Sequence, residues 1–112
     1  MDKYLIEKAK EAKKNRQKAM LATVIAAQGS APRDKGAKML ILEEGKIFGT
    51  IGGGELEAEI IAQAVSLMKE AETGASKYNF DLSNEEVAVK GGVCGGQVEV
   101  FLEPIIWGEG SD

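Results

Sequence analysis

A short and almost wholly apolar run, Met20–Ala27 (Met-Leu-Ala-Thr-Val-Ile-Ala-Ala), places the strongest limit on the fold of this chain. The run is far shorter than the roughly 20 apolar residues of a membrane span, and it contains β-branched residues, which favour strands. A strand exposed on one side alternates apolar and polar residues, whereas a strand buried on both sides is continuously apolar. We therefore expect Met20–Ala27 to be a strand covered on both faces.

The flanking segments show helical and hairpin patterns. Lys3–Arg16 is charged, but apolar residues recur in it at helical spacing, which predicts an amphipathic helix with a modest apolar face: Leu5, Ala9 and Ala12. Residues 38–42 and 46–51 are apolar segments on either side of Glu43-Glu44-Gly45. Glycine between two such segments is typical of a β-hairpin turn.

The second half of the chain predicts one longer helix and two further strands. The helix follows Gly52-Gly53-Gly54 and runs through Lys69, with apolar residues at helical intervals: Leu56, Ile60, Ile61, Ala64, Val65 and Met68. Residues 77–82 alternate polar and apolar, as a half-buried strand does. Residues 97–103 alternate likewise, and we expect Pro104 to end that strand. Three methionines fall at predicted core positions: Met20, Met39 and Met68.

These elements predict a single α/β (α+β) domain. Its sheet has about five strands, mixed or mostly antiparallel, with the long helix covering one face and a short helix at the N-terminus. We expect the domain to extend over residues 1–107 and residues 108–112 to be a frayed tail.

Composition excludes several classes of function. The 112 residues include no histidine, which rules out histidine acid–base catalysis, a Ser-His-Asp triad and most zinc sites. The net charge of -4 argues against a general nucleic-acid binder. A single cysteine cannot form an internal disulfide, and no apolar leader or membrane span is visible. We expect a cytoplasmic protein.

Two loops are candidate anion sites. Gly29-Ser30-Ala31-Pro32-Arg33, with Lys38 nearby, combines a hydroxyl with an arginine fork, although an ordinary Pro/Gly loop with solvated charges has the same composition. Gly52-Gly53-Gly54 opens onto the long helix, where free amides and the helix dipole favour an anion. Glu55 would compete for those amides, and a tight turn alone also accounts for the glycines.

The third candidate is Cys94, which lies between two glycine pairs in Gly91-Gly92-Val93-Cys94-Gly95-Gly96. Glycine lets the backbone bend around the sulfur and lets a ligand approach it. A thiolate is a nucleophile and a soft metal ligand. Equally, free cysteine is often a small buried hydrophobe, and the segment alone leaves both interpretations open.

Together these motifs resemble the XdhC/CoxI family. The resemblance rests on Gly29–Arg33, Gly36–Met39, Gly52–Glu57 and Cys94–Val100 followed by Glu103-Pro104, and it extends from about Met20 to Pro104. The chain resembles the N-terminal domain of that family, in a stand-alone or truncated form without the Rossmann-like domain that members usually carry. Members also commonly have a second cysteine where this chain has Glu55.

The resemblance implies a role in maturing molybdenum hydroxylases of the xanthine dehydrogenase and carbon monoxide dehydrogenase type. It implies transient binding of the molybdenum cofactor (molybdopterin), assistance in its sulfuration, and transfer to the apoenzyme. Cys94 is then the catalytic candidate and no residue is assigned to a resident metal. The cofactor-binding candidates are Ser30, Arg33, Lys38, Gly52, Gly53, Gly54, Glu55, Cys94, Gly95 and Gly96.

The resemblance favours a cofactor-binding chaperone over a turnover enzyme, with the apoenzyme as its partner. A cysteine desulfurase and a second copy of the chain are further candidate partners. Two alternatives stay open: a sulfurtransferase-like protein with a persulfide on Cys94, and a non-catalytic interaction module whose glycine loops are structural.

Overall fold

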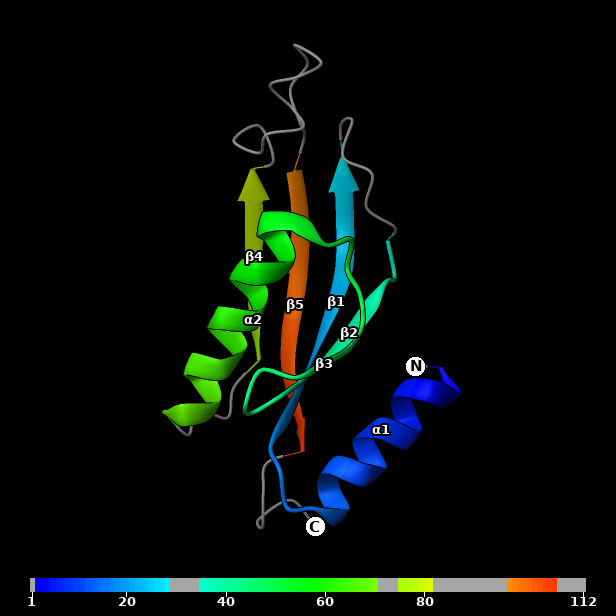
Figure 1. Cartoon of the computed structure of the whole chain (residues 1–112). Coiled ribbons are helices and arrows are strands. Elements are labelled where there is room, and N and C mark those ends of the chain that lie inside the picture. The colour runs from blue at the N-terminus through cyan, green and yellow to red at the C-terminus, as the bar shows by residue number, and fades with distance from the viewer. Residues whose placement is uncertain (1, 29–34, 71–74, 82–96, 107–112) are drawn as a thin grey trace.

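The computed structural model describes residues 2–28, 35–70, 75–81 and 97–106. These residues form two helices and five strands, whose arrangement can be followed in Figure 1. Their bounds are α1 (Lys3–Lys14), β1 (Ala19–Gln28), β2 (Lys38–Leu42), β3 (Ile47–Gly49), α2 (Gly54–Lys69), β4 (Ser76–Asp81) and β5 (Gln97–Ile106).

The five strands form one sheet in the order β3-β2-β1-β5-β4. Every neighbouring pair is antiparallel. Figure 1 shows α2 lying across one face of this sheet. The structure therefore confirms the predicted α+β class, the five strands and the long covering helix.

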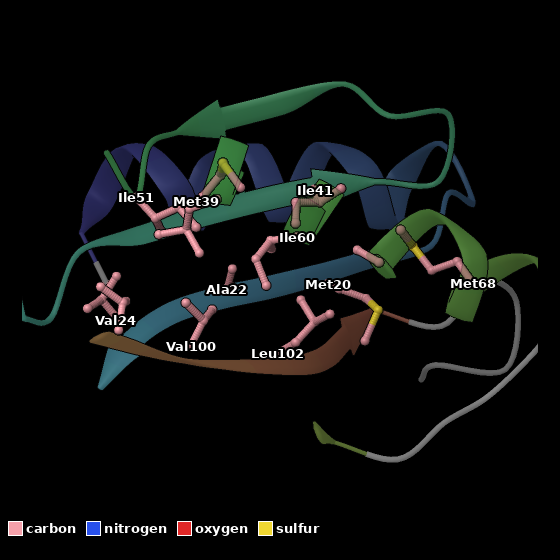
Figure 2. Close-up of a cluster of buried hydrophobic side chains, with 13 residues drawn as sticks. Met20, Ala22, Val24, Met39, Ile41, Ile51, Ile60, Met68, Val100 and Leu102 are labelled. Atoms are coloured by element: carbon pink, nitrogen blue, oxygen red, sulfur yellow. The ribbon is translucent and has the colours of Figure 1, made fainter. Parts of the chain in front are cut away.

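The first half of β1 is buried on both faces, as its apolar run predicted, whereas Thr23 and residues 25–27 are only half-buried. Met20, Ala22 and Val24 point to a core cluster that includes residues of α2, whereas Ala19 and Leu21 belong to a second cluster with α1. Figure 2 shows the first cluster gathered around β1, β2, β5 and α2. The predicted core methionines are confirmed, each at most 1% exposed: Met20, Met39 and Met68.

α1 supplies the second covering layer. The Oδ1 atom of Asp2 accepts a hydrogen bond from the amide of Leu5 at 2.9 Å, which caps the first turn of the helix. Lys13 and Lys14 lie in the last turn, where cations offset the helix dipole. The predicted apolar face is buried against the sheet: Leu5, Ala9 and Ala12.

The second strand of the hairpin is shorter than the sequence predicts. β3 ends at Gly49, not at residue 51. Gly49 has a φ of 85°, and an added Cβ there would lie 2.6 Å from the carbonyl oxygen of Lys38. The strand stops because this backbone conformation leaves the extended region.

The predicted end of the last strand at Pro104 is wrong. β5 continues to Ile106, and its register against β1 shifts at this point, where Ala19 pairs with Ile106 but Met20 pairs with Pro104. A proline cannot donate a ladder hydrogen bond, but such an irregularity tolerates it. The strand therefore passes through the proline.

Candidate functional site

The predicted site residues divide into two groups. Lys38, Gly52, Gly53, Gly54 and Glu55 lie in the described part of the chain. The others lie outside the described residues: Ser30, Arg33, Cys94, Gly95 and Gly96. The site can therefore be built upward from the glycine turn and its surroundings.

All three glycines of the turn adopt positive φ, at 116° for Gly52, 74° for Gly53 and 71° for Gly54. Such angles are accessible to glycine and costly for other residues. The backbone of the turn thus requires glycine. An added Cβ at Gly53 would meet no heavy atom within 4 Å, so its conformation, and not close packing, selects glycine at that position.

A single carboxylate oxygen holds this turn in place. Oε1 of Glu57 accepts hydrogen bonds from the hydroxyl of Thr50 at 2.7 Å, the amide of Ile51 at 3.2 Å and the amide of Gly53 at 3.0 Å. The amide of Gly52 donates to the Thr50 hydroxyl oxygen at 3.0 Å. The N-cap residue of α2 is Gly53, which has no side chain to accept a hydrogen bond at the start of the helix. The carboxylate of Glu57 takes over this capping role.

Two buried side chains anchor the ends of the turn. Ile51 is 1% exposed and Leu56 is 2% exposed, and both belong to the core cluster beneath α2. The segment between them, Gly52 to Glu55, is exposed or half-buried. The turn is therefore an exposed loop with fixed ends, and Figure 2 shows Ile51 within the packed cluster.

The hydrogen bonds within the glycine turn limit which ligands its amides can bind. The amides of Gly52 and Gly53 already have acceptors, and the acceptor for Gly53 is a carboxylate that an incoming anion would have to displace. Glu55 adds a second, exposed carboxyl group at the same helix end. The open space over Gly53 admits close approach. A bare phosphate at the Gly53 amide would therefore compete with Glu57 for the same donor.

Lys38 lies on the other side of the sheet from α2. Its neighbours Met39 and Leu40 pack against α2 and α1 respectively, so alternation places the Lys38 side chain on the α1 side. There its Nζ atom is 3.5 Å from the hydroxyl of Thr23, the residue opposite it on β1. The backbone carbonyl of Lys38 lies next to Gly49, shortly before the glycine turn. The ammonium group of Lys38 is nevertheless on the α1 side of the sheet, whereas the turn leads into α2 on the other side.

Sequence reasoning missed the role of Glu57 and did not identify Thr50. The familiar capping-box signature places a serine or threonine three residues before the acid, whereas Thr50 and Glu57 are seven residues apart. The acidic residues in the first turn of α2, Glu55 and Glu57, suit the positive end of the helix dipole, but this pattern does not single out Glu57. Only the fold of the turn brings Thr50 back to Glu57.

The described residues lack two features, a cluster of metal ligands and a membrane-spanning helix. The described residues contain no group of three acidic or cysteine side chains placed to hold a metal ion. Neither α1 nor α2 combines the length and apolar character that a bilayer-crossing helix needs.

With this geometry established, comparison with known proteins identifies the family. The model of the XdhC and CoxI family matches residues 12–79, more than half of the 112 residues. The chain belongs to the XdhC and CoxI family. The matched region contains Ser30, Arg33, Lys38 and the glycine turn, while the Cys94 segment lies beyond it.

Two individual proteins and one crystal structure are also similar to this chain. The chain is 32% identical over 82 residues to the Escherichia coli K12 protein named uncharacterized protein YqeB, covering 73% of this chain and 15% of that protein. It is 28% identical over 91 residues to a Bacillus subtilis protein named as a probable xanthine dehydrogenase subunit, covering 81% and 28%. The crystal structure of a xanthine dehydrogenase from Bacillus halodurans superposes with a TM-score of 0.68 at 32% identity, covering 89% and 30%. The chain thus spans less than a third of each relative.

Proposed function

We propose that this chain is an accessory protein for the maturation of molybdenum hydroxylases of the xanthine dehydrogenase and carbon monoxide dehydrogenase type. In this role it binds the molybdenum cofactor transiently and assists its sulfuration or its insertion into the apoenzyme. The observation that carries the proposal is the family match over residues 12–79. Two of the three similar proteins have names that refer to xanthine dehydrogenase, and these names support the same enzyme context.

The cofactor is cargo in this proposal, and its parts differ in chemistry. Its phosphate is an anion, its pterin is a flat hydrogen-bonding ring, and its dithiolene holds a thiophilic metal. Because Glu57 already occupies the Gly53 amide, we assign the phosphate to Ser30 and Arg33, whose side chains are a hydroxyl and a guanidinium cation. Lys38 is not assigned to it, because its ammonium group lies on the face of the sheet opposite the glycine turn. The pterin is assigned to the face of the glycine turn.

The remaining assignments concern sulfur. Cys94, flanked by Gly95 and Gly96, is the residue proposed to approach the metal or the sulfur being transferred. The proposed partners are the apoenzyme, a cysteine desulfurase that supplies sulfur, and a second copy of this chain in a homodimer. We place this activity in the cytoplasm.

The test is anaerobic gel filtration of the protein with released molybdenum cofactor, following pterin fluorescence and molybdenum in the protein peak. The Cys94→Ser and Arg33→Ala variants are run in parallel. We expect co-elution with the unmodified protein, loss with Cys94→Ser and weaker retention with Arg33→Ala. Co-elution unchanged in Cys94→Ser would remove the thiol from the site, and no co-elution with the unmodified protein would contradict cofactor binding.

One observation favours a second candidate, a non-catalytic interaction module. The amides of Gly52 and Gly53 are satisfied within the chain, as expected if the glycine turn is structural. The gel filtration separates the two functions, because an interaction module binds the apoenzyme but retains neither pterin nor molybdenum.

A further inference from the structure

The two edges of the sheet differ in their capacity to pair with another strand. β3, at one edge, has three residues and ends at a glycine of positive φ, and short edge strands are a common protection against pairing. β4, at the other edge, has six residues, and all six pair with β5 without a register shift. β4 contains neither proline nor glycine. Among the described strands, β4 is therefore the regular edge.

The sequence of β4, Ser-Lys-Tyr-Asn-Phe-Asp, is complementary to itself in antiparallel pairing. A two-fold axis through Asn79 sets position 77 opposite position 81 of a second copy, and position 78 opposite position 80. By sequence these are a lysine opposite an aspartate and a tyrosine opposite a phenylalanine. Opposite charges and aromatic pairs are the favourable cross-strand combinations. Other registers lose the charge pair. If the second strand is shifted by two residues in one direction, Lys77 lies opposite Asn79, and in the other direction it lies beyond the end of the second strand.

The described surroundings of Lys77 fit this register. Its side chain is 55% exposed, and its Nζ atom lies 3.7 Å from Oε2 of Glu99 on β5. In this register, position 81 of a second copy therefore lies opposite a lysine that already pairs with Glu99. Tyr78 packs against the core cluster beneath α2, so alternation sends Lys77 and Asn79 to the opposite face. Each proposed pair then lies on one face of the sheet.

We infer that two copies of this chain associate through β4, joining their sheets into one continuous antiparallel sheet with the two-fold axis at Asn79. The inference rests on the homodimer in the proposed function and gives it an interface. A symmetric contact of this kind closes on itself and stops at two copies.

Disulfide trapping tests the register. In a Cys94→Ser background, Asn79→Cys sets two thiols on the axis, where facing Cα atoms lie about 4.5–5.5 Å apart, within disulfide range. Lys77→Cys is the matched control on the same strand and face, because its two copies are separated by about 13 Å along the strands. With diamide as oxidant, we expect a covalent dimer from Asn79→Cys and none from Lys77→Cys. No dimer from Asn79→Cys, or equal yields from both, would overturn the inference.

Sedimentation of charge variants provides a second and reversible test. Lys77→Glu places a glutamate opposite Asp81 at two symmetric positions of the dimer. We expect the dissociation constant of the dimer to rise about tenfold. The exchanged variant, Lys77→Asp with Asp81→Lys, should return it towards the original value. A dissociation constant unchanged in Lys77→Glu, or no recovery in the exchange, would reject this pairing. Neither experiment contains cofactor, so failure here leaves cofactor binding to be judged separately.

Discussion

At the scale of single residues, Glu57 is the side chain on which the glycine turn depends most. One of its carboxylate oxygens accepts hydrogen bonds from Thr50, Ile51 and Gly53. Two of these donors, the amides of Ile51 and Gly53, are partly buried, and removing the acceptor of a partly buried donor costs more than the net strength of the bond suggests. Glu57 therefore stabilises the turn through its hydrogen bonds as well as through its negative charge at the helix end.

We expect Glu57→Ala to lower the free energy of unfolding by about 1–3 kcal/mol, because three donors lose their common acceptor. Glu59→Ala is the matched control, since Glu59 is an exposed carboxylate on the same helix. Urea denaturation of both variants measures the difference. Equal losses in the two variants would mean that Glu57 contributes only its charge near the helix end.

Gly49 provides a second prediction at this scale. Gly49→Ala combines the strain of a left-handed backbone, about 1–2 kcal/mol, with a Cβ lying 2.6 Å from the Lys38 carbonyl oxygen. Gly45→Ala is the control, because Gly45 has a φ of 96° but open space around its added Cβ. We expect Gly49→Ala to be the more destabilising by at least about 1 kcal/mol in thermal unfolding. A difference near zero would show that the hairpin relaxes freely.

At the scale of elements, α1 and α2 cover opposite faces of the sheet, and β1 and β2 supply alternate residues to both. The helical spacing of Leu5, Ala9 and Ala12 was enough to predict which face of α1 is buried. The sequence did not predict that β5 passes through Pro104, because the register shift that tolerates the proline arises from pairing with β1.

The layer formed by α1 can be tested with two adjacent aliphatic residues. Leu5 is 2% exposed beneath the helix, and Ile6 is 37% exposed on its outer side. We expect Leu5→Ala to cost about 2–5 kcal/mol, because it opens a cavity between α1 and the sheet, and Ile6→Ala to cost at most about 0.5 kcal/mol. Urea denaturation measures both. Similar costs would contradict the packing of α1 on the sheet.

At the scale of the whole molecule, the two core clusters share strands and so should not unfold independently. We expect Leu5→Ala, in the α1 cluster, and Ile60→Ala, in the α2 cluster, each to lower the midpoint of one and the same unfolding transition. Circular dichroism and amide NMR signals from both layers should report coincident curves. Separate transitions for the two layers would show that α1 is a dispensable addition.

The candidate site shows how far prediction from sequence reached. Gly52, Gly53 and Gly54 were recognised as a turn before a helix, and the structure supplies the reason for glycine in their positive φ angles. We expected a carboxylate to compete with an anion for the amides of the turn, and assigned this effect to Glu55. In the structure it is Glu57 that accepts the hydrogen bond of the Gly53 amide. The order of residues along a loop does not determine which neighbouring side chain folds back to bind its amides, because that depends on the three-dimensional path of the loop.

By itself, the sequence determined the local order of this protein: which segments form helices and strands, that the first half of β1 is buried on both faces, and which family its motifs resemble. These properties follow from periodicity and composition over a few neighbouring residues. Only the tertiary structure decided that β4 lies at an edge among the described strands, that Lys38 and the glycine turn face different sides of the sheet, and that Glu57 closes that turn. Each of these depends on the pairing of distant strands or on how a loop folds back, and local patterns do not specify such contacts.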